Sequence, residues 1–166
     1  MNATGDAGAT AGTGPKAIPA NGTVLGFDVG ARRIGVAVGN ALTGSARAVA
    51  VVDVHAVGPD WSHADRLLRE WRPDGLVVGD PMTLDGGDQP IRKAARDFAR
   101  ELHQRTRLPV VMVDERNSSQ EAARRFAVAR AEGRSKRRDA DALDALAAAV
   151  ILERWLAAPH AGQPVD

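Results

Sequence analysis

Apolar and polar positions repeat with two different periods along the chain, and the change of period predicts an α/β fold. Residues 24–29 and 34–39 are short apolar runs on either side of the sequence GARR, which predicts two strands joined by a hairpin turn at Gly30. The sequence ARAVAVVDV at residues 46–54 predicts a third strand. Three consecutive strands with short connections indicate an antiparallel meander.

After the third predicted strand the pattern alternates between helices and short buried strands. Apolar residues recur at helical spacing in PDWSHADRLLREWRPD, where Pro73 ends the helix, and in IRKAARDFARELHQRT. Buried strands of the parallel type are predicted over residues 75–80 and 109–115, which indicates right-handed crossovers. Two further helices are predicted over residues 118–131 and 139–157. The expected order is three strands, helix, strand, helix, strand and two helices.

Composition sets the bounds of the predicted domain. Residues 1–22 are mostly Ala, Gly and Thr with almost no bulky apolar side chain, so burial cannot offset the entropy of ordering them. We expect a disordered N-terminal tail over residues 1–22, one globular domain over residues 23–157 and a flexible C-terminal tail over residues 158–166. A chain of 166 residues with 44% hydrophobic and 26% charged residues suits one such domain.

The residue types and patterns that are missing exclude several kinds of protein. The chain has no cysteine, which excludes disulfides, thiolate catalysis and cysteine-based zinc sites. No apolar run approaches the roughly 18 residues of a membrane span, and the N-terminus lacks the pattern of a signal peptide. We therefore expect a cytoplasmic protein with no membrane partner.

Basic residues are clustered although the net charge is only +1. The sequence RAEGRSKRR at residues 130–138 holds five basic residues against one Glu. Such clusters on a nearly neutral chain suit a protein that binds a phosphate backbone and has an acidic active site, whereas solvated helix faces are the structural alternative. The candidate nucleic-acid-binding residues from the basic clusters are Arg32, Arg33, Arg134, Lys136, Arg137 and Arg138.

Asp28 interrupts the first apolar run, and this position requires an explanation. Strand alternation groups Asp28 with Val24 and Gly26 on one face of the strand. A buried, isolated carboxylate costs several kcal/mol, so Asp28 needs a cation, hydrogen-bond donors or an open cleft. Two interpretations remain open: a cap that accepts N–H groups of the GARR turn, and a functional ligand.

Asp114 and Glu115 end the last predicted parallel strand, where the ligand crevice of an open α/β sheet lies. Alternation groups Asp114 with Met112 and Glu115 with Val113, so only one of the two acids faces the crevice. The pattern leaves open which set faces it. Capping of the next helix is the structural alternative for either acid.

The last predicted helix carries further acids. Asp144 heads a stripe formed with Ala148, Ile151 and Trp155, and Asp141 lies one turn before it. A carboxylate on an apolar stripe points toward the core, whereas an acid in a first helical turn also stabilises the helix dipole.

Acids from the first strand, a later strand and the last helix can converge on one site. Oxygen-only ligands suit a hard cation such as Mg2+ or Mn2+, and two such ions activate a water and stabilise the leaving oxygen of a phosphodiester. The sequence therefore indicates a nuclease that needs no covalent nucleophile. Asp114 and Asp141 are secondary acid candidates.

Several motifs occur in the order and spacing of a known family. FDVGARRIGVAVGN is followed by TG at residues 43–44, VVGDP, DGG, DERNSS and the Asp-bearing DALAAAVILE. Together these motifs resemble the YqgF family of bacterial RNase H-like proteins, which are described as pre-16S rRNA nucleases and, in older descriptions, as Holliday junction resolvases. The resemblance covers almost all of residues 23–156.

This resemblance implies an RNase H-like α/β fold with a five-stranded mixed sheet, an antiparallel meander then parallel strands, flanked by helices. It implies a two-metal site of Mg2+ or Mn2+ in which Asp28, Glu115 and Asp144 are catalytic residues and metal ligands, with Arg116 as a phosphate contact. The implied activity is hydrolysis of phosphodiesters in 5′-end processing of pre-16S rRNA, or alternatively at four-way DNA junctions. The implied partners are structured nucleic acid and ribosomal particles, and both a monomer and a homodimer remain open.

The chain departs from the family pattern at two places. Asp80 stands before Pro81 where an apolar residue is usual, and NSS follows DER where LST is usual. Asp80 is either an additional acid at the cleft or a turn residue.

Two other classes of protein share parts of the pattern. Sugar kinases and actin-like ATPases also begin with a strand and DxG, but they need a second domain and a second phosphate loop. A nucleic-acid-binding, ribosome-associated factor with little catalytic activity would use the same basic cluster as a nuclease.

Overall fold

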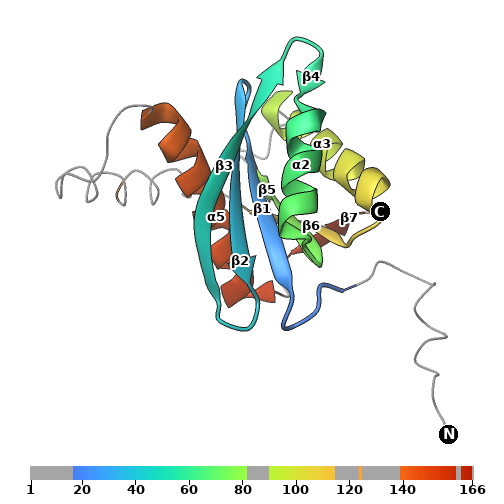
Figure 1. The fold of residues 1–166 in the computed structure, drawn as a ribbon, viewed down its shortest axis with the longest axis vertical. Helices are drawn as coiled ribbons and strands as arrows, with labels where there is room; N and C mark the ends of the chain where they lie inside the picture. The colour runs from blue at the N-terminus through green and yellow to red at the C-terminus, as the bar shows by residue number, and fades with distance from the viewer. Residues whose placement is uncertain (1–16, 82–89, 115–123, 125–138, 160–161, 166) are drawn as a thin grey trace, which may run out of the picture.

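The computed structural model describes residues 17–81, 90–114, 124, 139–159 and 162–165. The described residues form one curled mixed sheet with helices on both of its faces (Figure 1). Helices α2 (Trp61–Trp71) and α3 (Pro90–Thr106) cover one face, and α5 (Asp139–Ala157) covers the other. Among these helices none is long and apolar enough to cross a membrane.

Seven strands of the described residues form the sheet, in the order β4-β3-β2-β1-β5-β6-β7. The first three pair antiparallel, and β5 and β6 continue the sheet from β1 in parallel. These five strands confirm the predicted meander followed by parallel strands. The bounds are β1 Thr23–Val29, β2 Arg33–Asn40, β3 Ser45–His55, β4 Gly58–Pro59, β5 Gly75–Asp80, β6 Val110–Asp114 and β7 Gln163–Val165.

The sheet differs from the predicted five strands by two short edge strands. β4 forms where the chain turns back after β3 at Gly58, whose φ of 124° is a conformation that favours glycine. β7 pairs antiparallel with β6 and so provides partners for N–H and C=O groups along the outer edge of that strand. Residues 163–165 therefore belong to the sheet rather than to the flexible tail that we expected.

The packed domain also begins earlier than residue 23. Ile18, within the expected N-terminal tail, packs against the apolar cluster beneath α5. A side chain at Gly75 would collide with Ile18, so glycine at the start of β5 makes room for this contact. Residues 1–16 lie outside the described residues, as does the predicted helix over residues 118–131 apart from Arg124.

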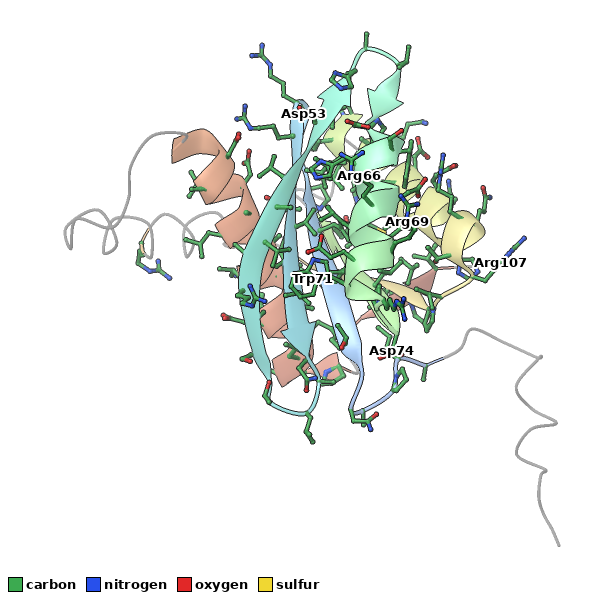
Figure 2. The ribbon with its side chains drawn as sticks, viewed as in Figure 1. Asp53, Arg66, Arg69, Trp71, Asp74 and Arg107 are labelled. Carbon is green, nitrogen blue, oxygen red and sulfur yellow. The ribbon has the colours of Figure 1, made fainter. Side chains whose placement is uncertain are left out.

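Helix α2 is bounded by a capping aspartate at its start and by a left-handed residue at its end. The Asp60 side chain caps its first turn by accepting a hydrogen bond from the backbone N–H of His63 at 3.2 Å. Arg72 takes a left-handed conformation before Pro73, which confirms the predicted end of the helix. Trp71 lies at this end of α2 (Figure 2), and the Arg47 guanidinium lies 5.2 Å from its ring centroid, so the contact ties α2 to β3.

Strand alternation divides the apolar side chains of β1 between the two faces of the sheet. Leu25 and Phe27 belong to the cluster under α2 and α3, and Val24 belongs to the cluster under α5. The predicted alternation of β1 is thus confirmed. Because Gly26 and Asp28 share the parity of Val24, they lie on the face that α5 covers.

Candidate active site

Asp28 lies near the carboxyl end of β1, half-buried, on the α5 face of the sheet. Its cross-strand partner on β2 is Gly35. Residues that stand directly opposite each other in an antiparallel pair project to the same face. Gly35, directly opposite Asp28, therefore contributes no side chain to the space beside the Asp28 carboxylate.

Gly35 brings α5 into contact with the sheet beside Asp28. A Cβ atom at Gly35 would overlap the backbone carbonyl oxygen of Asp144. Farther along the same helix, a Cβ atom at Gly26 would lie 2.9 Å from the Cβ atom of Leu152. Gly35 is thus opposite Asp28 and in contact with the backbone of Asp144, so these two predicted acids, which are far apart in sequence, both lie beside Gly35 on one face of the sheet.

Asp144 stands where the buried stripe of α5 reaches the surface. Ala148, Ile151 and Trp155, which share the stripe, are buried in the cluster beneath the helix. The Asp144 side chain itself is 32% exposed. The stripe therefore faces the core as predicted, and its first member presents a carboxylate at the rim.

Arg33, the first residue of β2, pairs with the acids of α5. Its Nε donates a hydrogen bond to Oδ2 of Asp144 at 2.7 Å and lies 3.4 Å from Oδ1 of Asp141. Its cross-strand partner on β3 is Asp53, which Figure 2 labels. The hydrogen bond and the charge of Asp144 raise the pKa of Arg33 above its ordinary value, and Asp141 and Asp53 add to this effect. The positive charge of Arg33 thus offsets the negative charges of Asp144 and Asp141.

The pairing of Arg33 with Asp144 is a feature that the basic cluster does not predict. The GARR turn predicts a substrate contact for this arginine. Alternation in β2 is the sequence signal for the ion pair with Asp144, because it puts Arg33 on the same face of the sheet as Gly35. Its partner is 111 residues away, so it is identified only by the packing of α5 on the sheet.

The structure shows which set of alternating residues in β6 faces α5. Val113 packs in the cluster beneath α5, whereas Met112 packs in the cluster under α2 and α3. By alternation Asp114 lies on the α3 face, on the other side of the sheet from Asp28. Glu115, which the sequence pattern groups with Val113, lies outside the described residues.

Asp80 at the end of β5 forms an ion pair with α3. Arg92 donates from Nε to Oδ1 of Asp80 at 2.9 Å and from Nη2 to Oδ2 at 3.4 Å. Both side chains are only 17% exposed. Asp80 shares the parity of Val78 in the cluster under α2 and α3, so it lies on the opposite face from Asp28. We conclude that this acid connects β5 to α3.

Replacing Asp80 by Asn is expected to lower the free energy of unfolding by about 1–3 kcal/mol, because it weakens two charge-assisted hydrogen bonds between Arg92 and Asp80 in a largely buried position. Urea unfolding measures this change. Asp97→Asn in the same region is the control: Asp97 pairs with Lys93, is 49% exposed and is expected to contribute less than about 0.5 kcal/mol. Equal losses in the two variants would contradict a structural role for the buried pair.

The other predicted site residues are only partly within the described chain. In this part of the molecule no three His, Asp or Glu side chains come together closely enough to hold a metal ion. Arg32 is exposed in the turn between β1 and β2. The remaining predicted phosphate contacts lie outside the described residues; they are Arg116, Arg134, Lys136, Arg137 and Arg138.

A curled mixed sheet in which an antiparallel meander is followed by parallel strands, with helices on both faces, is the RNase H-like fold. A similar fold occurs in two solved structures of RuvC from Thermus thermophilus, one of them in complex with a Holliday junction substrate. The TM-scores are 0.51 for the complex and 0.50 for the second structure, with 20% and 18% sequence identity. Each comparison covers 86% of this chain and 99% of the other. At this identity the similarity shows the fold alone.

Residues 22–158 match the family described as "RuvX: Holliday junction resolvase". Relatives from Xanthomonas axonopodis pv. citri and Xanthomonas campestris pv. campestris (strain B100) are each 70% identical to this chain and are named "Putative pre-16S rRNA nuclease". The matches cover 86% and 87% of this chain and 92% and 93% of the relatives. The chain belongs to the RuvX family, a family of nucleases, which confirms the resemblance carried by its motifs.

Proposed function

We propose that this protein is a metal-dependent endonuclease whose active site lies on the α5 face of the sheet. The observation that carries the proposal is that Gly35 stands opposite Asp28 and against the backbone of Asp144, so both acids lie beside it on this face. Glu115 is the proposed third ligand. Its assignment is supported by the packing of Val113 under α5, because the alternation in the sequence groups Glu115 with Val113.

The chemistry of these donors suits Mg2+ or Mn2+. All three proposed ligands are carboxylates, and hard divalent cations prefer oxygen. The Asp144 side chain is 32% exposed, so a cation can reach its carboxylate from solvent. When bound, two such ions activate a water molecule and stabilise the leaving oxygen of a phosphodiester.

The fold holds the proposed ligands on rigid elements. Asp28 is in the middle of the sheet, in a strand with neighbours on both sides, and Asp144 is on a helix pressed against that sheet at Gly35. Catalytic groups on strands and helices are positioned more precisely than groups on loops. Arg32 and the basic residues 134–138 are proposed to bind backbone phosphates, which would make the affinity for nucleic acid depend on salt.

The proposed substrate is the 5′ leader of the precursor of 16S rRNA, and this choice is supported by the names of the relatives from Xanthomonas. A four-way DNA junction is the second candidate, which the description of the matched family favours. Both substrates present the same phosphodiester to the same carboxylates. A ribosomal particle would be the natural carrier of the first substrate, whereas a junction is cut symmetrically by two sites.

A cleavage assay that compares the two substrates tests the proposal. We expect the purified protein, with Mg2+ or Mn2+, to cleave a precursor of 16S rRNA at its 5′ side faster than a synthetic four-way junction of equal concentration. A chelator should stop the reaction, and restored Mg2+ should restart it. Preferential cleavage of the junction would select the second substrate. Binding of RNA without cleavage of either substrate, under all metal conditions, would contradict the enzyme assignment.

A further inference from the structure

One guanidinium connects two carboxylates of α5 at the proposed active site. Arg33 Nε lies 2.7 Å from Oδ2 of Asp144 and 3.4 Å from Oδ1 of Asp141. The acids are three residues apart, so they lie on neighbouring turns of one helix face. The side chains are half-exposed, at 35% for Arg33, 32% for Asp144 and 49% for Asp141, so the contact lies at the rim where a substrate would arrive.

Arg33 occupies a position that conflicts with metal ligation by Asp144. An arginine bonded to a carboxylate oxygen and a divalent cation bound to the same carboxylate repel each other, and they compete for the same lone pairs. Asp141 differs from Asp144 in this respect. Its carboxylate is 3.4 Å from Nε of Arg33. It lies one helical turn before Asp144, however, and it is Asp144 whose backbone contacts the sheet at Gly35, opposite Asp28.

We infer that Arg33 is a positioning residue that holds the Asp144 carboxylate until a divalent cation takes it, and that Asp141 is the acid that keeps Arg33 at the rim afterwards. The inference rests on the proposed metal site. In this inference Asp141 binds Arg33 when the metal is present, and Arg33 competes with the metal for the Asp144 carboxylate. Because only Nε takes part in these ion pairs among the described residues, the two terminal nitrogens are left to bind a phosphate oxygen of the substrate in the fork geometry that suits arginine.

This role predicts that metal affinity and cleavage respond in opposite directions when Arg33 is removed. In Arg33→Gln the competitor and its positive charge are absent, so the dissociation constant for Mn2+ should fall by about threefold to tenfold. The cleavage rate at saturating Mn2+ should also fall, by about tenfold or more, because a charge-assisted contact to the phosphate is lost. If Arg33 only stabilised the fold, Arg33→Gln would weaken metal binding and slow cleavage together.

Isothermal calorimetry with Mn2+ and the rise of the melting temperature on adding Mn2+ measure the first effect without any substrate. Arg32→Gln is the matched control, because it removes the same charge from the next residue, which is exposed in the turn. Its Mn2+ affinity should stay within about twofold of the wild type, since exposed charges at a distance are screened by salt. Arg33→Lys keeps the charge and guards against a folding defect in Arg33→Gln; its Mn2+ affinity should lie close to that of the wild type.

Each outcome of this experiment decides a different point. If the wild type binds Mn2+ and Arg33→Gln binds it equally or more weakly, the inference is wrong while the proposed metal site stands. If Arg32→Gln tightens Mn2+ binding as much as Arg33→Gln does, the effect is one of general charge, and the inference is again wrong. If neither the wild type nor any variant gives a heat or a melting shift with Mn2+, the proposed metal site itself fails, and the role of Arg33 fails with it.

Discussion

Asp28→Asn is expected to reduce the cleavage rate by about a thousandfold or more, since it removes an anionic ligand from a site that works by holding cations. Asn has nearly the same shape as Asp, and Asp28 lies at the half-buried end of β1, so the domain should stay folded. Cleavage of the precursor RNA with Mg2+ measures the loss, and urea unfolding of the same sample checks the fold.

The matched control for this substitution is Asp74→Asn. Asp74 precedes β5 at the other end of the sheet from Asp28, where Figure 2 labels it, and its Oδ2 accepts a hydrogen bond from the backbone N–H of Thr23 at 2.9 Å. This variant should keep the wild-type cleavage rate and lose a little stability. Full activity of the Asp28→Asn protein would show that Asp28 is not a catalytic metal ligand.

Gly35→Ala is expected to lower the free energy of unfolding by about 2–4 kcal/mol and to weaken Mn2+ binding at the same time. The added Cβ atom would overlap the carbonyl oxygen of Asp144, which is backbone and cannot rotate away. Helix α5 would have to move off the sheet, and Asp144 would move with it relative to Asp28. Urea unfolding and Mn2+ calorimetry measure the two consequences, and failure to obtain folded protein agrees with the same prediction.

Gly44→Ala separates this steric effect from the general cost of replacing a glycine. Gly44 lies in the turn between β2 and β3 with a φ of 72° and open space around its Cα, so alanine there costs only about 1–2 kcal/mol of backbone strain. Its Mn2+ affinity should not change, because the turn is at the other end of β2 from Gly35. An unfolding free energy for Gly35→Ala within about 0.5 kcal/mol of the wild type would show that α5 is not held at Gly35.

Local patterns in the sequence were sufficient for most of the secondary structure. The strand over residues 75–80 and the helix over residues 139–157 have the predicted bounds, because Pro, Gly and the change of period mark element ends within a few residues. The two missed strands lack such a signal. β4 consists of Gly58 and Pro59, and β7 contains Pro164 in three residues, so neither has a period to detect. Proline in β7 is tolerated because that strand lies at the sheet edge.

Family membership and the list of candidate acids could also be obtained from the sequence, since both depend on which residues stand at which spacing. Alternation in β1 correctly separated Val24 from Leu25 and Phe27, and the same alternation groups Asp28 with Val24 and Gly26. In β6, alternation separated Asp114 from Glu115 but carried no information on which side of the sheet helix α5 would occupy. The packing of Val113 beneath α5 supplied that information. By alternation Asp114 therefore lies on the opposite face of the sheet from Asp28.

The partner of each charge depended on contacts between distant parts of the chain. Asp80 was compatible with a turn or a cleft until α3 brought Arg92 to 2.9 Å from it. The guanidinium of Arg33 was compatible with a substrate contact alone until α5 brought Asp144 to 2.7 Å across 111 residues. Periodicity describes the face on which a side chain lies, because that is a property of one strand or helix. Which element covers that face follows from burial of the whole apolar surface, and this is a property of the folded domain.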